Sequence, residues 1–432
     1  MTARLTQLRI PAFKSVRGAR LHLGPLTLLV GRNGSGKSNV IDAMAVLSAL
    51  ASGAPIREAL DGGRDGPLVR GGSEGCAPVG EDSFRIGCGA VIDGDVCHLD
   101  IKIAVRPSVQ IARERLWTRH RAGARAGEPL DLLRTDPPGP DSADITARWH
   151  NGKQGPNPTL TFRATQLVTS QVATRVPAKT KAGQHVHAVA QQMLEAMKGV
   201  FILDPVPHQM RTYVPEKDVN LRRNAENLSA VLAELRNNKQ TRVDLRSLVR
   251  SLSESHISSI GFARSELGDV MAVLMEHFDS TKFPVPARLM SDGTLRFLAV
   301  AAALLGRPHD QESPARAERL LVVEEIENGL HPSQVALLLD RLRSSASLGV
   351  RTLATTHSPA ILDALQGEDH SGVVVCSRDD SGWSRVTRLT DFPDYFEVAG
   401  QGSLGMAASR DRLRPRAEPE MPPRPLADVL GL

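Results

Sequence analysis

LTLLVGRNGSGKSNVIDAM, residues 26–44, is the stretch that determines the expected fold of this chain. Its first five residues form a continuous apolar run, which is typical of a strand buried on both faces of a sheet. GRNGSGKS (31–38) then matches the full pattern of a phosphate-binding loop, and apolar residues at helical spacing follow it. An ordinary glycine-rich turn could share the pattern, but the strand before it and the helix after it favour a nucleotide site.

The residue types of this loop fit the chemistry of bound ATP. Glycines allow backbone N–H groups to turn inward around phosphate oxygens, and the helix that begins near Lys37 adds its positive end. Lys37 is expected to neutralise the β- and γ-phosphates, and the Ser38 hydroxyl to bind Mg²⁺. The predicted nucleotide-binding residues of the loop are Arg32, Asn33, Gly34, Ser35, Gly36, Lys37, Ser38 and Asn39.

A second apolar strand, RLLVV (319–323), ends in two acids, Glu324 and Glu325. In proteins with a phosphate-binding loop, such a strand lies beside the loop. Glu324 is then expected to hold Mg²⁺ through water, and Glu325 to polarise the attacking water as a general base. Paired acids after an apolar run also occur as a helix cap or a solvated turn, so the upstream loop is what favours the catalytic interpretation.

Two further segments follow along the chain. Ser291 precedes the helical stretch TLRFLAVAAALL (294–305), so one interpretation is a simple N-cap. The other is that the Ser291 hydroxyl, the Gly293 N–H and the helix dipole bind the γ-phosphate of ATP held by a second subunit. His357 ends the next buried strand, VRTLATTH (350–357), where a structural histidine and a γ-phosphate switch are the alternatives.

Taken together, these segments resemble the SMC/RecF/OLD-like branch of ABC ATPases, the group often labelled AAA-15/AAA-21 ATP-binding proteins. The likeness covers about the first 50 residues and most of 284–365, and it includes two segments near 201–235. Most of 106–200 resembles no family that we can name. The residues that carry the likeness are LRIPAFKSV (8–16), LTLLVGRNGSGKSNVIDAM (26–44), FILDPVPHQMR (201–211), ENLSAVLAEL (226–235), LMSDGTLRFLAVAAALL (289–305), LLVVEEIENGLHPSQ (320–334) and LATTHSPAILDAL (353–365).

The resemblance implies an α/β fold: an ABC-type P-loop ATPase head with an antiparallel β-lobe and an inserted, mainly helical region. It also implies that two heads sandwich two ATP molecules, and that Phe13 to Ser15 lie near the nucleotide. Each ATP would be served by two sets of residues: Lys37, Ser38, Glu324, Glu325 and His357 from one subunit, and Ser291 and Gly293 from the other.

Three features depart from the family pattern. Glu324 stands where many ABC proteins have aspartate. No glutamine obviously fits the loop that senses the γ-phosphate, and no aromatic residue is a convincing platform for adenine.

The chain is expected to divide into four parts. The expected parts are the N-terminal half of the head (1–105), a basic, loop-rich and then helical insertion (106–283), the C-terminal half of the head (284–400) and a Pro-rich tail (401–432). Within the insertion, the Gly, Pro and Asp of 123–160 predict loop or partial disorder, and the apolar spacing of 184–280 predicts helices, including LGDVMAVLMEHF (267–278). The tail is interpreted as a linker with a small docking element or as a frayed terminus.

Apolar runs, cysteines and charged stretches indicate where the protein is located and what it could bind. No apolar run approaches the roughly 20 residues that span a bilayer, and the first residues contain no signal peptide, so a cytoplasmic protein without membrane contact is expected. The four cysteines, with no C-x-x-C pair, indicate buried thiols rather than a metal site at Cys97-His98. The arginine-rich stretch 106–125 fits either nucleic-acid phosphates or a solvated strand edge, and these alternatives stay open.

The function expected from these features is an ATP-hydrolysing ATPase that forms a homodimer, or a higher homo-oligomer, head to head around ATP. It would act in DNA repair or anti-phage defence with a separate effector such as a nuclease, because the stretch after His357 is too short for a Toprim nuclease domain. An ATP-controlled scaffold or sensor with little turnover is the alternative. A transporter ATPase subunit is disfavoured, because the span from Lys37 to Ser291 alone is near the length of the whole core of such subunits.

Overall fold

A 14-stranded sheet runs through the larger part of the molecule, in the order β10-β15-β16-β3-β17-β18-β2-β1-β4-β5-β6-β7-β8-β9. The computed structural model describes residues 3–62, 69–120, 126–139, 142–250, 256–278, 281–306, 318–400, 402–410 and 413. The strands of this sheet are β1 (Ala3–Phe13), β2 (Val16–His22), β3 (Leu26–Val30), β4 (Ser83–Ile92), β5 (Asp95–Ala104), β6 (Gln110–Arg119), β7 (Pro129–Thr135), β8 (Asp144–Trp149), β9 (Thr159–Arg163), β10 (Val200–Leu203), β15 (Arg319–Val323), β16 (Val350–Thr356), β17 (Val373–Arg378) and β18 (Ser384–Arg388).

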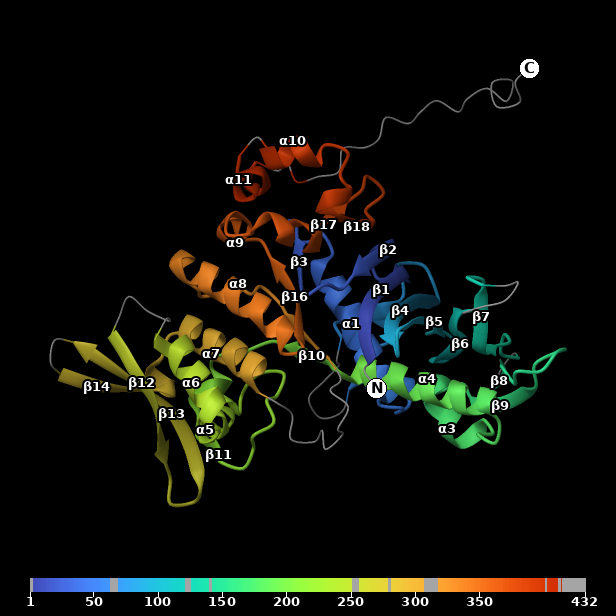
Figure 1. Cartoon of the computed structure of the whole chain (residues 1–432), viewed down its shortest axis with the longest axis horizontal. Helices are drawn as coiled ribbons and strands as arrows, with labels where there is room; N and C mark the ends of the chain where they lie inside the picture. The colour runs from blue at the N-terminus through green and yellow to red at the C-terminus, as the bar shows by residue number, and fades with distance from the viewer. Residues whose placement is uncertain are drawn as a thin grey trace.

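The α-helices lie around the large sheet and beside it (Figure 1). They are α1 (Lys37–Leu50), α2 (Ile56–Asp61), α3 (Val172–Arg175), α4 (Lys181–Lys198), α5 (Leu228–Asn237), α6 (Lys239–Arg250), α7 (Asp292–Leu305), α8 (Pro332–Ser347), α9 (Pro359–Asp363), α10 (Tyr395–Gly400) and α11 (Leu404–Ser409). No described helix is both long and apolar enough to cross a membrane. The α/β fold expected from the sequence is confirmed.

The five strands β10, β15, β16, β3 and β17 run parallel and form the centre of the head. Every residue of β3 and β16 is buried, as the apolar run LTLLV predicts. Register places Ala354 of β16 opposite both Val323 of β15 and Leu28 of β3. The carboxyl ends of these three strands therefore meet at one edge of the sheet, where open α/β sheets bind ligands.

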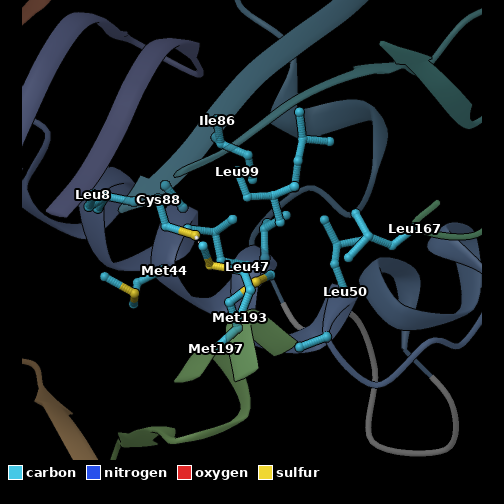
Figure 2. Packing of buried hydrophobic residues seen from close by; sticks show 14 of the residues in the cluster. Leu8, Met44, Leu47, Leu50, Ile86, Cys88, Leu99, Leu167, Met193 and Met197 are labelled. Carbon is cyan, nitrogen blue, oxygen red and sulfur yellow. Dashed lines mark hydrogen bonds between the residues drawn. The ribbon is translucent and has the colours of Figure 1, made fainter. Parts of the chain in front are cut away.

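Strands β2, β1 and β4 to β9 form an antiparallel lobe beside this centre. Figure 2 shows the core under the lobe, where Met44 and Leu47 of α1 gather with Cys88 of β4 and Met193 of α4. The sulfur atoms of Cys88 and Met193 are 3.7 Å apart. All four cysteines are buried thiols, as the sequence indicates.

The lobe is larger than the sequence predicted. Residues 123–160 were expected to be loop or partly disordered, but this range contains β7 and β8, which continue the sheet, so this prediction is wrong. The Gly and Pro residues lie mainly in the connections, while β8 alternates exposed and buried residues. The boundary expected after residue 105 therefore falls between two paired strands, β5 and β6.

The helical prediction for 267–278 is also wrong, because these residues contain β13 (Asp269–Phe278). This strand pairs with β11 (Val214–Pro215), β12 (His256–Arg264) and β14 (Thr281–Pro286) in a second sheet. Its apolar run fits a helix or a strand equally well, and the pairing with β12 decides for the strand. The predicted helices α4, α5 and α6 are present. The expected insertion 106–283 therefore contains strands β6 to β9 of the large sheet, these helices and the second sheet.

Part of the expected tail belongs to the head. The backbone N–H of Gly405 in α11 donates to Asp363 of α9 at 2.6 Å, and Leu413 lines a cavity of about 170 Å³ beside Gly31 and His357. The linker and docking-element hypothesis concerns 414–432, which lie outside the described residues.

Glu114 is a buried carboxyl group of β6 that holds the turn following β9. Its oxygens accept hydrogen bonds from the N–H of Val168 at 2.7 Å and from the N–H and hydroxyl of Thr169 at 2.6 and 2.5 Å. Burial raises the pKa of Glu114 from 4.5 to about 7, against these hydrogen bonds, which lower it.

We expect Glu114→Gln to flatten the pH dependence of stability. Because the folded-state pKa of about 7 lies above the ordinary 4.5, the unfolded chain loses this proton first as pH rises. The free energy of unfolding therefore falls between about pH 4.5 and pH 7, by up to about 3 kcal/mol from this group. Urea unfolding of both proteins at about pH 5 and pH 7.5 measures the effect. An equal change in the two proteins would contradict the prediction.

Candidate functional site

The phosphate loop follows β3 and has the backbone that its glycines permit. Gly34 and Gly36 have φ angles of 78° and 106°, in the left-handed region. A Cβ atom at Gly36 would lie 2.2 Å from the Ser384 hydroxyl, and one at Gly31 would lie 2.2 Å from the Cys376 carbonyl oxygen. Ser35 carries a buried hydroxyl with no hydrogen-bond partner in the described part of the chain. A tight concave loop with an unsatisfied polar atom fits a phosphate ligand.

Lys37 lies over the same loop. Its ammonium group donates to the carbonyl oxygens of Gly31 at 2.6 Å and Arg32 at 3.0 Å. Burial lowers the pKa of Lys37, and the nearby Cys376 and Glu325 oppose that effect. The side chain therefore holds a buried positive charge over the loop, at the place where phosphate charge would bind.

Ser38 and Glu324 meet, as the order of the motifs predicts. The Ser38 hydroxyl donates to Glu324 Oε2 at 3.3 Å, and Arg70 forms an ion pair with the same oxygen at 3.2 Å. Burial raises the pKa of Glu324, while Arg70 lowers it. Neither motif pointed to Arg70, which lies in a segment far from both in the sequence.

These oxygen atoms fit Mg²⁺, which prefers hydroxyl and carboxylate oxygens and is usually shared with substrate phosphates. Among the described residues no group of three or more His, Cys, Asp or Glu side chains forms a metal site of its own. Ser38 and Glu324 are therefore the residues that would hold the ion, and the ion would supply positive charge to the nucleotide phosphates.

Glu325 has a strained backbone, with a φ angle of 48°. Its N–H donates to the Thr355 hydroxyl at 2.8 Å, and its side chain accepts a hydrogen bond from Asn328. A non-glycine residue in this region costs about 1–3 kcal/mol, and such strain concentrates at functional sites. The surrounding contacts hold the carboxylate at the carboxyl edge of the parallel sheet.

His357 is held by a third acid, Glu327, that sequence reasoning did not single out. Glu327 Oε1 accepts the backbone N–H of His357 at 2.8 Å and lies 3.2 Å from its ring Nδ1. Glu327 is 10% exposed, whereas the imidazole is 48% exposed. The available signal was its place two residues after Glu325, in the sequence EEIEN.

Ser291 and Gly293 lie at the start of α7. Ser291 is the N-cap, because its hydroxyl accepts the N–H of Thr294 at 3.1 Å. Gly293 packs so closely on Gly329 that a Cβ atom there would lie 1.8 Å from the Gly329 carbonyl oxygen. In the described part of the chain, no hydrogen bond joins either residue to the phosphate loop of the same subunit.

The hairpin β17–β18 supports the phosphate loop from the other side. Arg378 donates from Nε to the Gly34 carbonyl oxygen at 2.8 Å. The Ser384 hydroxyl lies 2.7 Å from the Ser15 hydroxyl, which in turn accepts from Asn39 at 2.8 Å. Ser15 thus lies next to the loop, as the resemblance implies. Arg378 had no sequence signal, since its role depends on β17 pairing with β3.

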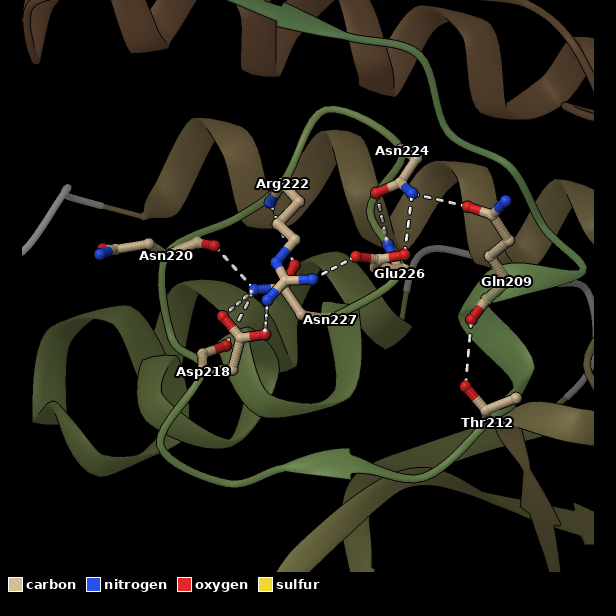
Figure 3. A network of polar contacts seen from close by, with 8 residues as sticks. All are labelled: Gln209, Thr212, Asp218, Asn220, Arg222, Asn224, Glu226 and Asn227. Carbon is tan, nitrogen blue, oxygen red and sulfur yellow. Dashed lines mark hydrogen bonds and ion pairs between the residues drawn. The ribbon is translucent and has the colours of Figure 1, made fainter. Parts of the chain in front are cut away.

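The segment after β10 is tied together by a polar network (Figure 3). The buried Asn227 donates to the carbonyl oxygens of Asp218 and Asn220 at 2.8 and 2.7 Å. Gln209, the glutamine of this segment, accepts from Asn224 at 2.6 Å. The side-chain amide oxygen of Gln209 is therefore used inside the network. The glutamine that would sense the γ-phosphate stays unassigned.

The comparison with known families identifies the group. The family described as "AAA domain, putative AbiEii toxin, Type IV TA system" matches residues 26–89 and 177–363, which include the phosphate loop, the paired acids and His357. The chain belongs to this family. It is an ABC ATPase of the SMC/RecF-like type, as the resemblance implied.

This ATPase is also similar to individual proteins. It is 34% identical over 131 residues to the DNA replication and repair protein RecF of Acidothermus cellulolyticus, and the match covers 30% of each chain. The chain thus spans less than a third of that relative's length. It is similar to the SmcHead bound to the C-winged helix domain of ScpA (TM-score 0.48, 14% identity, 89% of this chain and 97% of that one). It is also similar to the SMC head domain from Thermotoga maritima (TM-score 0.41, 13% identity, 89% and 98%).

Proposed function

We propose that this ATPase binds and hydrolyses ATP with Mg²⁺, and that two copies close head to head around the nucleotide. The observation that supports this best is the contact of Ser38 with Glu324 at 3.3 Å, directly before the strained Glu325. It joins the phosphate loop, the metal ligands and the candidate base at one edge of the sheet.

The proposed reaction uses the residues as follows. Backbone N–H groups of the loop and the Lys37 ammonium bind the β- and γ-phosphates. Glu325 accepts a proton from water as the water oxygen bonds to the γ-phosphorus and the bond to ADP breaks. His357, oriented by Glu327, contacts the γ-phosphate. Mg²⁺, when bound, neutralises phosphate charge.

The start of α7 supports the proposed dimer. Ser291 and Asp292 are exposed, and Arg211 fixes the helix start by pairing with Asp292 at 2.7 Å. A fixed, exposed helix N-terminus with a serine hydroxyl is suited to a phosphate group. In a homodimer this N-terminus would contact the γ-phosphate bound to the other copy, so that ATP shifts the population toward the dimer.

Ser291→Arg tests this arrangement. The variant should bind ATP as a monomer but associate in ATP roughly tenfold or more weakly, because it loses the hydroxyl and fills the phosphate position. Light scattering after size-exclusion chromatography, in a Glu325→Gln background that is expected to retain ATP, measures the association. Ser291→Thr keeps the cap hydroxyl and is the matched control. ATP-dependent dimerisation of Ser291→Arg at the normal concentration would refute the proposed arrangement.

A role in DNA repair or anti-phage defence, with a separate effector such as a nuclease, completes the proposal. It is supported by the similarity to a replication and repair protein and by the toxin–antitoxin description of the family. The alternative, an ATP-controlled scaffold with little turnover, uses the same site. Steady-state ATPase rates with and without DNA distinguish the two, since a scaffold would dimerise fully at negligible turnover.

A further inference from the structure

The outer face of the antiparallel lobe carries an unusual number of cations. We call this set the basic face: Arg9, Arg20, Arg85, Lys102, Arg113, Arg115, Arg134 and Arg148. These residues come from strands β1, β2 and β4 to β8, which lie next to one another in the sheet (Figure 1). The arginine-rich stretch of the sequence contributes Arg113 and Arg115, and its Arg121 and Arg125 lie outside the described residues.

Strand register aligns the basic face in two rows. In the first, each residue lies opposite the next across neighbouring strands: Arg20, Arg9, Gly87, Asp100, Arg115, Arg134 and Arg148. In the second, Arg85 lies opposite Lys102, and Lys102 opposite Arg113. The sequence neighbours of these residues, such as Leu116 and Leu133, are buried on the other face against the helices.

This arrangement is unfavourable for the isolated lobe, because like charges directly opposite each other on a sheet are destabilising. Three carboxylates offset part of the charge: Asp100 pairs with Arg9 at 3.0 Å, Asp131 with Arg115 at 2.5 Å and with Arg134 at 3.3 Å, and Asp136 with Arg148 at 3.2 Å. Arg20, Arg85, Lys102 and Arg113 have no ion pair within the part of the chain that the structure describes. The face therefore retains a positive excess that an external anion would neutralise.

The dimensions and chemistry of the face fit a phosphodiester backbone. Seven strands about 4.8 Å apart give the first row a length of roughly 30 Å, close to one turn of a nucleic-acid duplex. All but one of the eight cations are arginines, whose planar guanidinium groups bind phosphate oxygens in pairs. A row of such groups suits a regularly charged polymer better than a single small anion.

Trp117 lies among these cations, but its ring is not open to stacking with a base. Its ring is stacked with His98 at 4.1 Å, and Arg115 lies over it at 5.0 Å. Its indole N–H donates to Asp100 at 2.8 Å. The ring is thus covered by the protein's own side chains, and it orients Arg115 instead of offering a free surface to a base.

We propose that the basic face binds the phosphate backbone of a nucleic acid without sequence preference. This inference deepens the proposed DNA-related role by naming the surface, and it does not depend on ATP turnover. Affinity should fall steeply with salt, since each neutralised phosphate releases counterions.

The test uses the full chain with a triple variant of the unpaired row, Arg85→Ala, Lys102→Ala and Arg113→Ala. The control triple variant is Lys239→Ala, Arg242→Ala and Arg246→Ala on α6, which removes the same charge from exposed positions of another region. Fluorescence anisotropy with a labelled 30-base-pair DNA, an RNA duplex and a single strand is measured over a range of salt. Polyglutamate serves as a competitor, and binding of a fluorescent ATP analogue checks the nucleotide site separately.

We expect the basic-face variant to bind nucleic acid at least tenfold more weakly than the wild type, with a salt slope lower by about 2 to 3. The control variant should stay within about twofold, and all three proteins should bind the ATP analogue equally. Equal loss in both triple variants, no nucleic-acid binding by the wild type at low salt, or binding of polyglutamate in preference to nucleic acid would each overturn the proposal. Failure of the wild type to bind the ATP analogue would instead contradict the proposed function and leave the basic face untouched.

Discussion

Glu325→Gln should bind ATP as tightly as the wild-type chain and lose roughly 100-fold or more of its turnover, the usual contribution of a general base. The amide has nearly the shape of the carboxylate and can still accept the Asn328 hydrogen bond, but it cannot take a proton from water. ATP should then persist between the heads, and the variant should accumulate as a dimer.

Steady-state phosphate release, together with equilibrium binding of a fluorescent ATP analogue, separates the two effects. Glu266→Gln makes the same chemical change at an exposed turn and should leave both quantities unaltered. Normal turnover by Glu325→Gln would place the base elsewhere, and Glu327 would be the next residue to substitute. Loss of ATP binding would mean that Glu325 has a structural role at its strained position.

The local parts of this site were predictable because their chemistry is contiguous in sequence. Gly31 to Ser38 need only their own glycines, a buried strand before them and a helix after them, and the structure has all three. The contact of Ser38 with Glu324 spans 286 positions, yet it was expected, because the order of the motifs along parallel strands brings both to one edge.

Residues whose roles depend on pairing between distant strands were not predictable in this way. Arg378 reaches Gly34 across 344 positions only because β17 pairs with β3. The stretch 269–278 has an apolar run that suits either a helix or a strand, and its partner β12 is what makes it a strand. The basic face is a third example, since two cations become neighbours only through register, as Lys102 and Arg113 do.

Lys37→Ala is expected to have the largest effect on nucleotide affinity. Removing one partner of a desolvated, hydrogen-bonded charge pair costs about 2–5 kcal/mol, so ATP should bind roughly 30-fold to several thousand-fold more weakly. The lysine lies over the loop, donates to the backbone carbonyls of Gly31 and Arg32, and has its pKa lowered by burial. A charge held in this way interacts strongly with an added phosphate, because little solvent screens it.

The fold should survive this substitution, since the two carbonyl groups lie at a loop that solvent reaches. Circular dichroism and thermal unfolding verify this, and isothermal titration with Mg²⁺ and ATP measures the affinity. Lys217→Ala, at an exposed position of the segment after β10, is the matched control and should bind ATP normally. Unchanged affinity of Lys37→Ala would refute the phosphate-loop assignment itself. A folded variant that has lost ATP binding and ATP-dependent dimerisation but still binds nucleic acid would show that the head has two independent anion sites.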